Sequence, residues 1–98
     1  MELVNDLKNN GIDQLKRHVW AKLIPLSKGL ATYELSYDKT LVGRSAECFI
    51  RINDKRLSGK HCIINKRDDN IYILDLSTNG TFVNNNKIGK NIEKEVVD

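Results

Sequence analysis

Three short groups of residues carry the side chains that could bind an anion. Gly43 and Arg44 form the first group, Ser58 and His61 the second, and the run Ser77-Thr78-Asn79-Gly80-Thr81 the third. Each group stands at the start or end of a strand-like segment. A guanidinium can donate two parallel hydrogen bonds to a phosphate, and a serine hydroxyl can add a third. The three groups together therefore indicate a phosphate-binding site built on loops.

The pair Ser58 and His61 also raises the question of hydrolysis. The nucleophile elbow G-x-S-x-G is absent, because Arg56 and Lys60 occupy its two glycine positions. A separation of three residues does not by itself bring a hydroxyl onto an imidazole, and no orienting acid is evident. We therefore expect no catalytic residue here, and we interpret His61 as a structural residue that braces the Ser58 loop.

Cofactor and metal sites are not predicted either. Gly59-Lys60 matches part of a P-loop, but the first glycine of that motif is missing and His61 stands where it requires serine or threonine. Cys48 and Cys62 form no C-x-x-C pair, so a zinc site is not expected. We expect both cysteines to be reduced thiols, and we expect no cofactor and no metal.

The composition is that of one small globular domain. Of 98 residues, 40% are apolar and 30% charged, which argues against disorder. No run approaches the ~18 apolar residues of a membrane span. The segment from Met1 to Asp6 lacks the basic flank and apolar core of a secretory signal. We therefore expect an intracellular protein with no membrane partner.

The net charge of +3 is unevenly distributed. The segment from Arg44 to Arg67 has seven basic residues and two acidic ones, a net of +5, so the remainder carries −2. Such a basic stretch suits an anionic partner, such as a phosphopeptide, although a solvated basic face would look the same. A nucleic acid is an alternative that we do not favour, because few aromatic residues are present to stack on bases and no nucleic-acid-binding motif is found.

Short strand-like segments surround the three groups. Residues 1–18 predict a flank or linker, where a short helix is possible but is interrupted at Asn9-Asn10-Gly11. Later segments alternate apolar and polar residues between turn residues. They span residues 19–26, 32–37, 40–43, 48–52, 61–65, 70–76, 81–84 and 87–88. Strands this short and this closely spaced predict an all-β fold, an antiparallel β-sandwich.

The order and spacing of Gly43-Arg44, Ser58-x-x-His61 and Ser77-Thr78-Asn79-Gly80-Thr81 resemble the forkhead-associated (FHA) domain, a reader of phosphothreonine peptides. The resemblance covers about Trp20 to Gly89. It implies two sets of site residues, those that bind the phosphopeptide and those that support the binding loops. The first set is Arg44, Ser58, Gly59, Lys60, Thr78 and Asn79, and the second is Gly43, His61, Gly80 and Asn84.

Two residues bear on affinity and specificity. Gly59 stands where many FHA relatives carry a longer polar or basic side chain, so it can offer only its backbone amide. An FHA-like sandwich that has lost phosphate dependence therefore stays open as an alternative, beside the basic nucleic-acid-binding domain. Arg56 lies on the expected binding rim, where the resemblance implies selection of an acidic side chain three positions after the phosphothreonine.

The opening Val19-Trp20-Ala21-Lys22-Leu23 most resembles the FHA domain of checkpoint-type Ser/Thr kinases. This resemblance implies a nuclear location, a role in the DNA damage response, phosphothreonine-containing partner proteins and association with a second copy. We assign the FHA domain to residues 19–98. FHA domains have further strands after the Gly89 position, whereas residues 91–98 allow only one, so we expect truncated C-terminal strands. The chain is then a fragment of a longer protein, with no enzyme activity of its own and a kinase domain elsewhere.

Overall fold

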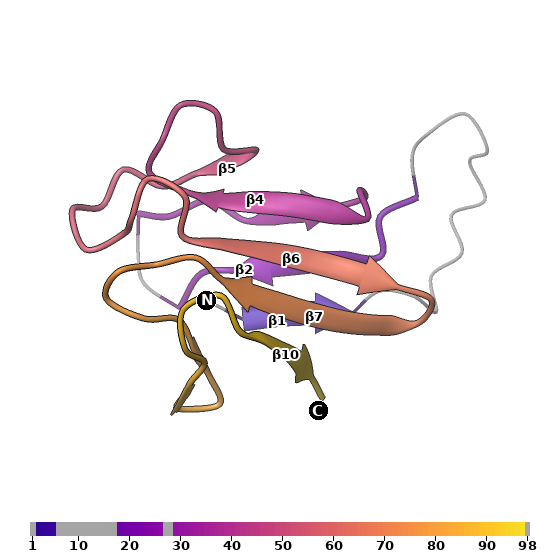
Figure 1. The fold of residues 1–98 in the computed structure, drawn as a ribbon. Coiled ribbons are helices and arrows are strands. Elements are labelled where there is room, and N and C mark those ends of the chain that lie inside the picture. The colour runs from indigo at the N-terminus through magenta and orange to yellow at the C-terminus, as the bar shows by residue number, and fades with distance from the viewer. Residues whose placement is uncertain (1, 6–17, 27–28, 98) are drawn as a thin grey trace. The chain divides into compact units, whose positions relative to one another are not determined.

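The computed structural model describes residues 2–5, 18–26 and 29–97, and this part of the chain is entirely β-structure and loops (Figure 1). It contains no helix long and apolar enough to cross a membrane. The chain divides after Tyr37 into two compact units, residues 1–37 and 38–98.

The first unit contains a three-stranded antiparallel sheet. Its strands are β1 (Glu2–Asn5), β2 (Ala21–Ile24) and β3 (Tyr33–Leu35), in the order β1-β2-β3. Trp20 is only 2% exposed, and its indole N–H donates to the carbonyl of Tyr37 at 3.0 Å. Its backbone N–H donates to the carbonyl of Leu35 at 2.9 Å. Trp20 is therefore buried with its polar nitrogen satisfied.

The second unit contains a five-stranded sheet and a separate hairpin. The sheet has the order β10-β7-β6-β4-β5, and only the β4–β5 pair is parallel. The strands are β4 (Lys39–Gly43), β5 (Ile50–Arg51), β6 (Cys62–Arg67), β7 (Asn70–Asp75) and β10 (Glu93–Val96). The hairpin pairs β8 (Phe82–Val83) with β9 (Asn86–Lys87).

Most predicted segments coincide with strands whose bounds shift by at most two residues. Strand β1 was not predicted. It pairs with β2, so Leu3 lies in a strand rather than in the short helix that the sequence allowed. The remainder of that helix, residues 6–17, lies outside the described residues. The single strand expected within residues 91–98 is β10, and it pairs with β7.

Two tight turns follow from residues that tolerate positive φ. The turn between β6 and β7 is short, because β6 continues to Arg67 and Asp68 takes a φ of 56°. The Arg67 guanidinium lies 3.9 Å from the centre of the Tyr72 ring and donates to Glu93 at 3.1 Å, which holds it in the sheet. Asn84 and Asn85, at φ values of 51° and 66°, form the turn of the β8–β9 hairpin.

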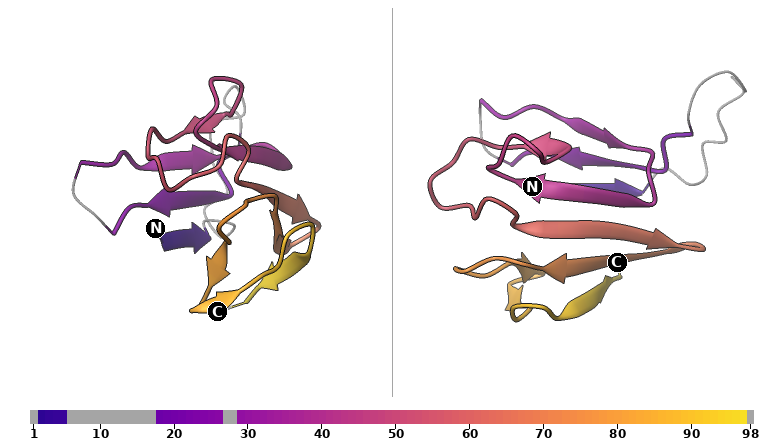
Figure 2. Two further views of the ribbon diagram at one scale, coloured as in Figure 1. Left: turned by 60° about the vertical axis from the view of Figure 1, so that its left-hand side comes forward. Right: turned by 45° about the horizontal axis from the view of Figure 1, so that its top comes forward.

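The loops that matter for function lie at one end of the second unit. Figure 1 shows the loop after β4, the loop before β6 and the loop after β7 at the left-hand end of the five-stranded sheet. The right-hand view of Figure 2 shows β4, β6, β7 and β10 side by side, with the same loops again at one end. All three groups of candidate residues belong to these loops, except Gly43, which is the last residue of β4.

Candidate functional site

Gly43 sets the separation of the first two loops. A Cβ at this position would lie 2.1 Å from the carbonyl oxygen of Gly59 and 2.9 Å from the backbone nitrogen of His61. The backbone of Gly59 therefore occupies the space of a side chain at Gly43. Hydrogen bonds fix this approach: the N–H of Arg44 donates to the carbonyl of Ser58 at 3.1 Å, and that of Ser45 to Gly59 at 3.0 Å.

The Arg44 side chain is exposed at the end of β4. Its backbone carbonyl accepts a hydrogen bond from Nε of Arg51 at 3.1 Å, which ties the loop after β4 to β5. Its guanidinium forms no ion pair with another described residue. This arginine can therefore bind an anionic ligand without first giving up an ion pair among those residues.

His61 connects the second loop to the third. The N–H of Ser58 donates to Nδ1 of His61 at 3.1 Å, and Nε2 of the ring lies 3.1 Å from the carbonyl oxygen of Gly80. An amide N–H can only donate and a carbonyl can only accept, so both contacts require the neutral ring with its proton on Nε2. Because His61 is 8% exposed, it acts as a buried brace between loops.

The Ser58 hydroxyl joins the same two loops from the outside. Its oxygen accepts the backbone N–H of Thr78 at 3.0 Å. A hydroxyl has one proton of its own, so Ser58 can still donate to a ligand oxygen while it holds Thr78. The Ser58 loop and the Thr78 loop are therefore linked at two points, through this hydroxyl and through His61.

A buried carboxylate supports the third loop from within. Asp75 is 1% exposed, and its Oδ1 accepts the N–H and the hydroxyl of Ser77, at 2.8 and 2.6 Å, and the hydroxyl of Thr81 at 2.8 Å. The Ser77 oxygen in turn accepts the N–H of Gly80 at 2.8 Å. Burial by itself raises the pKa of the Asp75 carboxyl, but the hydrogen bonds from Ser77 and Thr81 outweigh it and hold the pKa below its ordinary value.

Sequence reasoning gave no role to Asp75, and it placed Ser77 in the third group without a role of its own. The available signal was the run Asp75-Leu76-Ser77, since an aspartate two residues before a serine can accept its backbone N–H in an Asx turn. The network leaves Thr78 and Asn79 exposed at its tip, and the Asn79 side chain forms no hydrogen bond with another described residue.

Gly80 and Asn84 act through backbone geometry. Gly80 has a φ of 111°, and a Cβ there would lie 2.7 Å from Cε of Lys87 on β9. Asn84 is an exposed turn residue of the β8–β9 hairpin, and among the described residues its side chain makes no hydrogen bond to the Asn79 loop. Its connection to the site therefore runs through the hairpin that carries Lys87.

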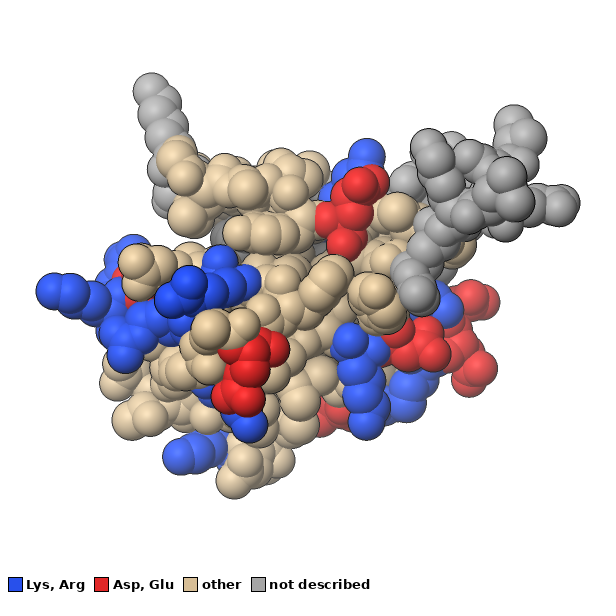
Figure 3. Space-filling model, turned by 90° about the horizontal axis from the view of Figure 1, so that it is seen from above, with Lys and Arg blue, Asp and Glu red and all other residues tan. Residues whose placement is uncertain are grey.

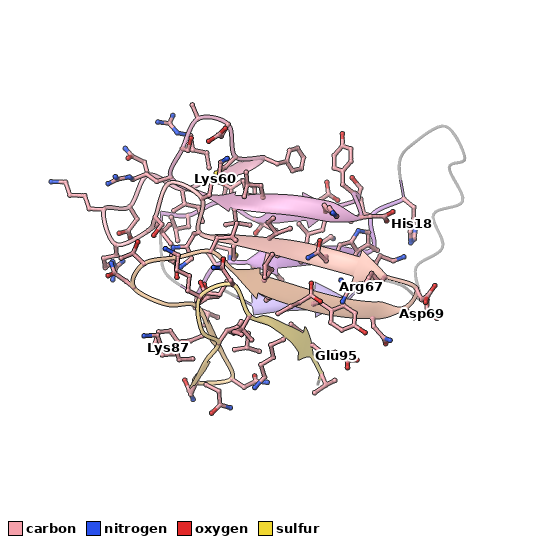
Figure 4. All side chains as sticks on the ribbon, viewed as in Figure 1. His18, Lys60, Arg67, Asp69, Lys87 and Glu95 are labelled. Carbon is pink, nitrogen blue, oxygen red and sulfur yellow. The ribbon has the colours of Figure 1, made fainter. Side chains whose placement is uncertain are left out.

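Two further basic side chains at these loops have acidic partners. Nζ of Lys60 lies 3.7 Å from Glu47, and both side chains are exposed. Arg56 forms a closer pair with Asp54, in which Nη2 contacts Oδ2 at 2.7 Å and Nε contacts Oδ1 at 3.0 Å. Figure 4 shows Lys60 at the loop end of the sheet. In Figure 3, Lys and Arg side chains gather at the left, where Figure 1 has the loops.

The two cysteines, one in the loop after β4 and the other at the start of β6, are free, buried thiols. The Cys48 thiol donates to the carbonyl of Gly59 at 3.1 Å, which adds a third hydrogen bond across the first two loops. Burial, with smaller contributions from Asp75 and Cys48, raises the pKa of the Cys62 thiol to about 12. No group of three or more metal-ligating side chains occurs among the described residues.

Comparison with known families gives a match to the model of the FHA domain over residues 40–97. Among curated proteins, the chain is 40% identical over 79 residues to the probable serine/threonine-protein kinase fhkC of Dictyostelium discoideum, covering 74% of this chain and 13% of that protein. It is 36% identical over 77 residues to fhkE of the same organism, covering 72% and 11%. The chain thus spans only about an eighth of the length of these relatives.

Solved structures give the same result. The N-terminal FHA domain of Rad53p from S. cerevisiae, in complex with a phosphothreonine peptide, matches with a TM-score of 0.70 and 28% identity, over 78% of this chain and 73% of that chain. Mycobacterium tuberculosis EmbR, in complex with a low-affinity phosphopeptide, matches with a TM-score of 0.70 and 27% identity, over 79% and 20%. The FHA1 domain of yeast Rad53 matches with a TM-score of 0.74 and 25% identity, over 93% and 68%. The predicted fold class, an all-β sandwich of this type, is confirmed.

Proposed function

This chain belongs to the FHA domain family, and on that premise we propose that it is a phosphothreonine-dependent peptide-binding module. It is a binding module rather than an enzyme, since the family match describes all three candidate loops and the kinase relatives match only over their FHA part. The residues proposed to contact the phosphopeptide are Arg44, Ser58, Gly59, Lys60, Thr78 and Asn79.

The arrangement of Arg44 and Ser58 is the observation that supports this function best. The Arg44 guanidinium has no ion-pair partner among the described residues, and the Ser58 hydroxyl keeps a proton to donate while its oxygen holds the Thr78 N–H. Phosphothreonine carries about −1.5 to −2 charges at neutral pH and three acceptor oxygens. The backbone N–H of Arg44 donates to the carbonyl of Ser58, so the guanidinium and the O–H donor belong to adjoining loops. Such a pair of donors suits a phosphate better than it suits a neutral ligand.

The supporting residues keep these donors in place. Gly43 admits the Gly59 backbone, His61 bridges Ser58 and Gly80, and the Asn84 turn carries the hairpin against Gly80. Because the loops are held by hydrogen bonds before any peptide arrives, binding orders few additional groups. Beyond this rigid part, Asn79 contacts the peptide main chain, and Arg56 is the rim residue that faces the side chain three positions after the phosphothreonine.

Fluorescence anisotropy with one peptide in three forms tests the proposal. The peptide carries phosphothreonine, phosphoserine or unmodified threonine, and Arg44→Ala is compared with Lys39→Ala. Lys39 stands at the other end of β4, so its removal deletes the same charge away from the loops. We expect the phosphothreonine form to bind best. Charge-assisted hydrogen bonds contribute roughly 1.5–3 kcal/mol each, so Arg44→Ala should weaken binding about 10- to 100-fold.

Three results would contradict this function. Equal binding of the phosphorylated and unmodified peptides would favour an interaction module that has lost phosphate dependence. A steeply salt-dependent affinity for oligonucleotides that exceeds the affinity for the peptide would favour a nucleic-acid binder. An equal loss of affinity in Arg44→Ala and Lys39→Ala would mean that overall charge, rather than a clamp at Arg44, attracts the peptide.

The surrounding protein is also a matter of proposal. We propose that residues 19–98 form the FHA module of a longer serine/threonine kinase of the checkpoint type, with β1 added to it from the preceding flank. This is supported by the kinase relatives, because the chain covers only 13% and 11% of their length. A nuclear location, a role in the DNA damage response and recruitment of phosphothreonine-containing proteins, including a second copy, follow from the same proposal. Localisation of the full-length protein before and after DNA damage tests it.

A further inference from the structure

The rim residue Arg56 is engaged by an acidic side chain of its own loop. Asp54 accepts Nε of Arg56 at 3.0 Å on Oδ1 and Nη2 at 2.7 Å on Oδ2, so the carboxylate binds the guanidinium with both oxygens. The backbone N–H of Arg56 also donates to Oδ1 at 2.9 Å. The side chain of Arg56 is 89% exposed and that of Asp54 is 32% exposed. The pair therefore faces solvent at the edge of the proposed binding site.

At the candidate site, Arg56 has a closer acidic partner than Arg44 or Lys60 has. The Arg44 guanidinium has no ion-pair partner among the described residues, and the carboxylate of Glu47 stays 3.7 Å from Lys60. The hydrogen bonds from the Arg56 side chain and then from its backbone lower the pKa of the Asp54 carboxyl to about 2, so Asp54 carries a full charge at neutral pH. Its negative charge therefore compensates the positive charge of Arg56 throughout the physiological pH range.

We propose that Asp54 is a specificity-determining residue, which competes with an acidic side chain of the bound phosphopeptide for the guanidinium of Arg56. This inference rests on the proposed function and refines it. Arg56 alone would select an acidic residue after the phosphothreonine. With Asp54 in place, the chain tolerates acidic and neutral residues at that position almost equally, and the phosphate contacts dominate recognition.

The competition follows from the geometry of the pair. A guanidinium offers two edges for a bidentate carboxylate, and Asp54 uses the Nε–Nη2 edge. A carboxylate from the peptide must either displace Asp54 or bind the remaining Nη1–Nη2 edge next to a like charge. Either route lowers the gain from an acidic side chain. The phosphate is affected less, because Arg44 and the Ser58 hydroxyl, which lie on other parts of the loops, are not engaged by Asp54.

Asp54→Asn tests the effect of the Asp54 charge while it keeps the structure of the loop. The asparagine keeps an Oδ1 that can accept the Arg56 N–H, and asparagine forms the same kind of turn as aspartate. It loses the negative charge and the second carboxylate oxygen. Asp69→Asn is the matched control, since Asp69 is exposed and Figure 4 shows it at the opposite end of the sheet from Lys60. It removes the same charge far from Arg56.

The experiment compares two phosphothreonine peptides that differ only in Asp or Ala three positions after the phosphothreonine. Their dissociation constants are measured for the wild-type chain, Asp54→Asn, Asp69→Asn and the double variant Asp54→Asn with Arg56→Ala. We expect the Asp peptide to bind less than about 2-fold better than the Ala peptide in the wild type and in Asp69→Asn. In Asp54→Asn the preference should rise to about 5-fold, the upper range for an exposed ion pair, and in the double variant it should disappear.

Three outcomes would overturn the proposal. An unchanged preference in Asp54→Asn would mean that Asp54 does not compete, and a smaller preference would mean that Asp54 positions Arg56 for the peptide instead. An equal rise in the double variant would assign the effect to general charge. Failure of the proposed function gives a different result: neither phosphothreonine peptide then binds the wild-type chain more tightly than the same peptide without phosphate. In that case the inference about Asp54 fails as well. A urea unfolding curve for each variant shows that the fold is retained.

Discussion

Gly43→Ala tests the close approach of the first two loops. The added Cβ would lie 2.1 Å from the carbonyl oxygen of Gly59, whereas ordinary contact begins at 3.4 Å, so backbone must move by more than an ångström. The atom in the way is not the end of a flexible side chain. It is a carbonyl that accepts the N–H of Ser45 at 3.0 Å and the thiol of Cys48 at 3.1 Å. Moving it lengthens both hydrogen bonds.

The expected loss of stability is about 2–4 kcal/mol. Overpacking a close contact costs roughly 1–3 kcal/mol, and a typical hydrogen bond contributes about 1 kcal/mol. Small domains have a free energy of unfolding of roughly 5–15 kcal/mol. Gly43→Ala is therefore expected to leave a folded but clearly weakened chain. Because the Ser58–Lys60 segment moves with Gly59, the affinity for a phosphopeptide should fall as well.

The assay is urea unfolding followed by circular dichroism and by the fluorescence of Trp20, the only tryptophan. Gly59→Ala is the matched control, because its Cβ would meet only Cβ of Ser45 at 3.8 Å, an ordinary contact. Both substitutions reduce the freedom of the unfolded chain in the same way, so Gly59→Ala should be neutral or stabilising by up to about 1 kcal/mol. A free energy of unfolding for Gly43→Ala within about 0.5 kcal/mol of that control would refute the reasoning.

Two further predictions concern the site and its support. The space at Gly59 accepts a side chain, so Gly59→Arg should bind a phosphothreonine peptide about tenfold more tightly. The unphosphorylated peptide should gain no affinity, and a gain for both forms would refute an added phosphate contact. Thr81→Val removes one hydrogen bond to Asp75 and should cost about 1–2 kcal/mol at pH 7. Because the folded-state pKa of Asp75 is depressed, the stabilisation from its carboxylate is present above about pH 4 and is lost as the pH falls further. The free energy of unfolding of Thr81→Val should therefore decline less than that of the wild type between about pH 5 and pH 3. Thr40→Val is the control, because the buried Thr40 hydroxyl has no partner among the described residues, and its acid profile should match that of the wild type.

Local sequence was enough to predict most strands. Alternation of apolar and polar residues identified β6 and β7, and turn residues separated them, because burial of one face and the φ of a turn are short-range requirements. Pairing between distant segments was not predictable in this way. The parallel pairing of β4 with β5 and the pairing of β1 with β2 each depend on which edge is free in the folded chain.

The candidate site divides in the same manner. The sequence by itself determined which chemical groups are present, because Arg44, Ser58 and Asn79 and the glycines beside them stand at strand ends that the pattern reveals. Only the tertiary structure decided what those groups touch. It brings the Ser58 hydroxyl to the Thr78 N–H and orients His61 between two loops, since contacts across 19 or 20 residues form only when the strands assemble. It also pairs Asp54 with Arg56, a choice of rotamers that a list of charges cannot specify.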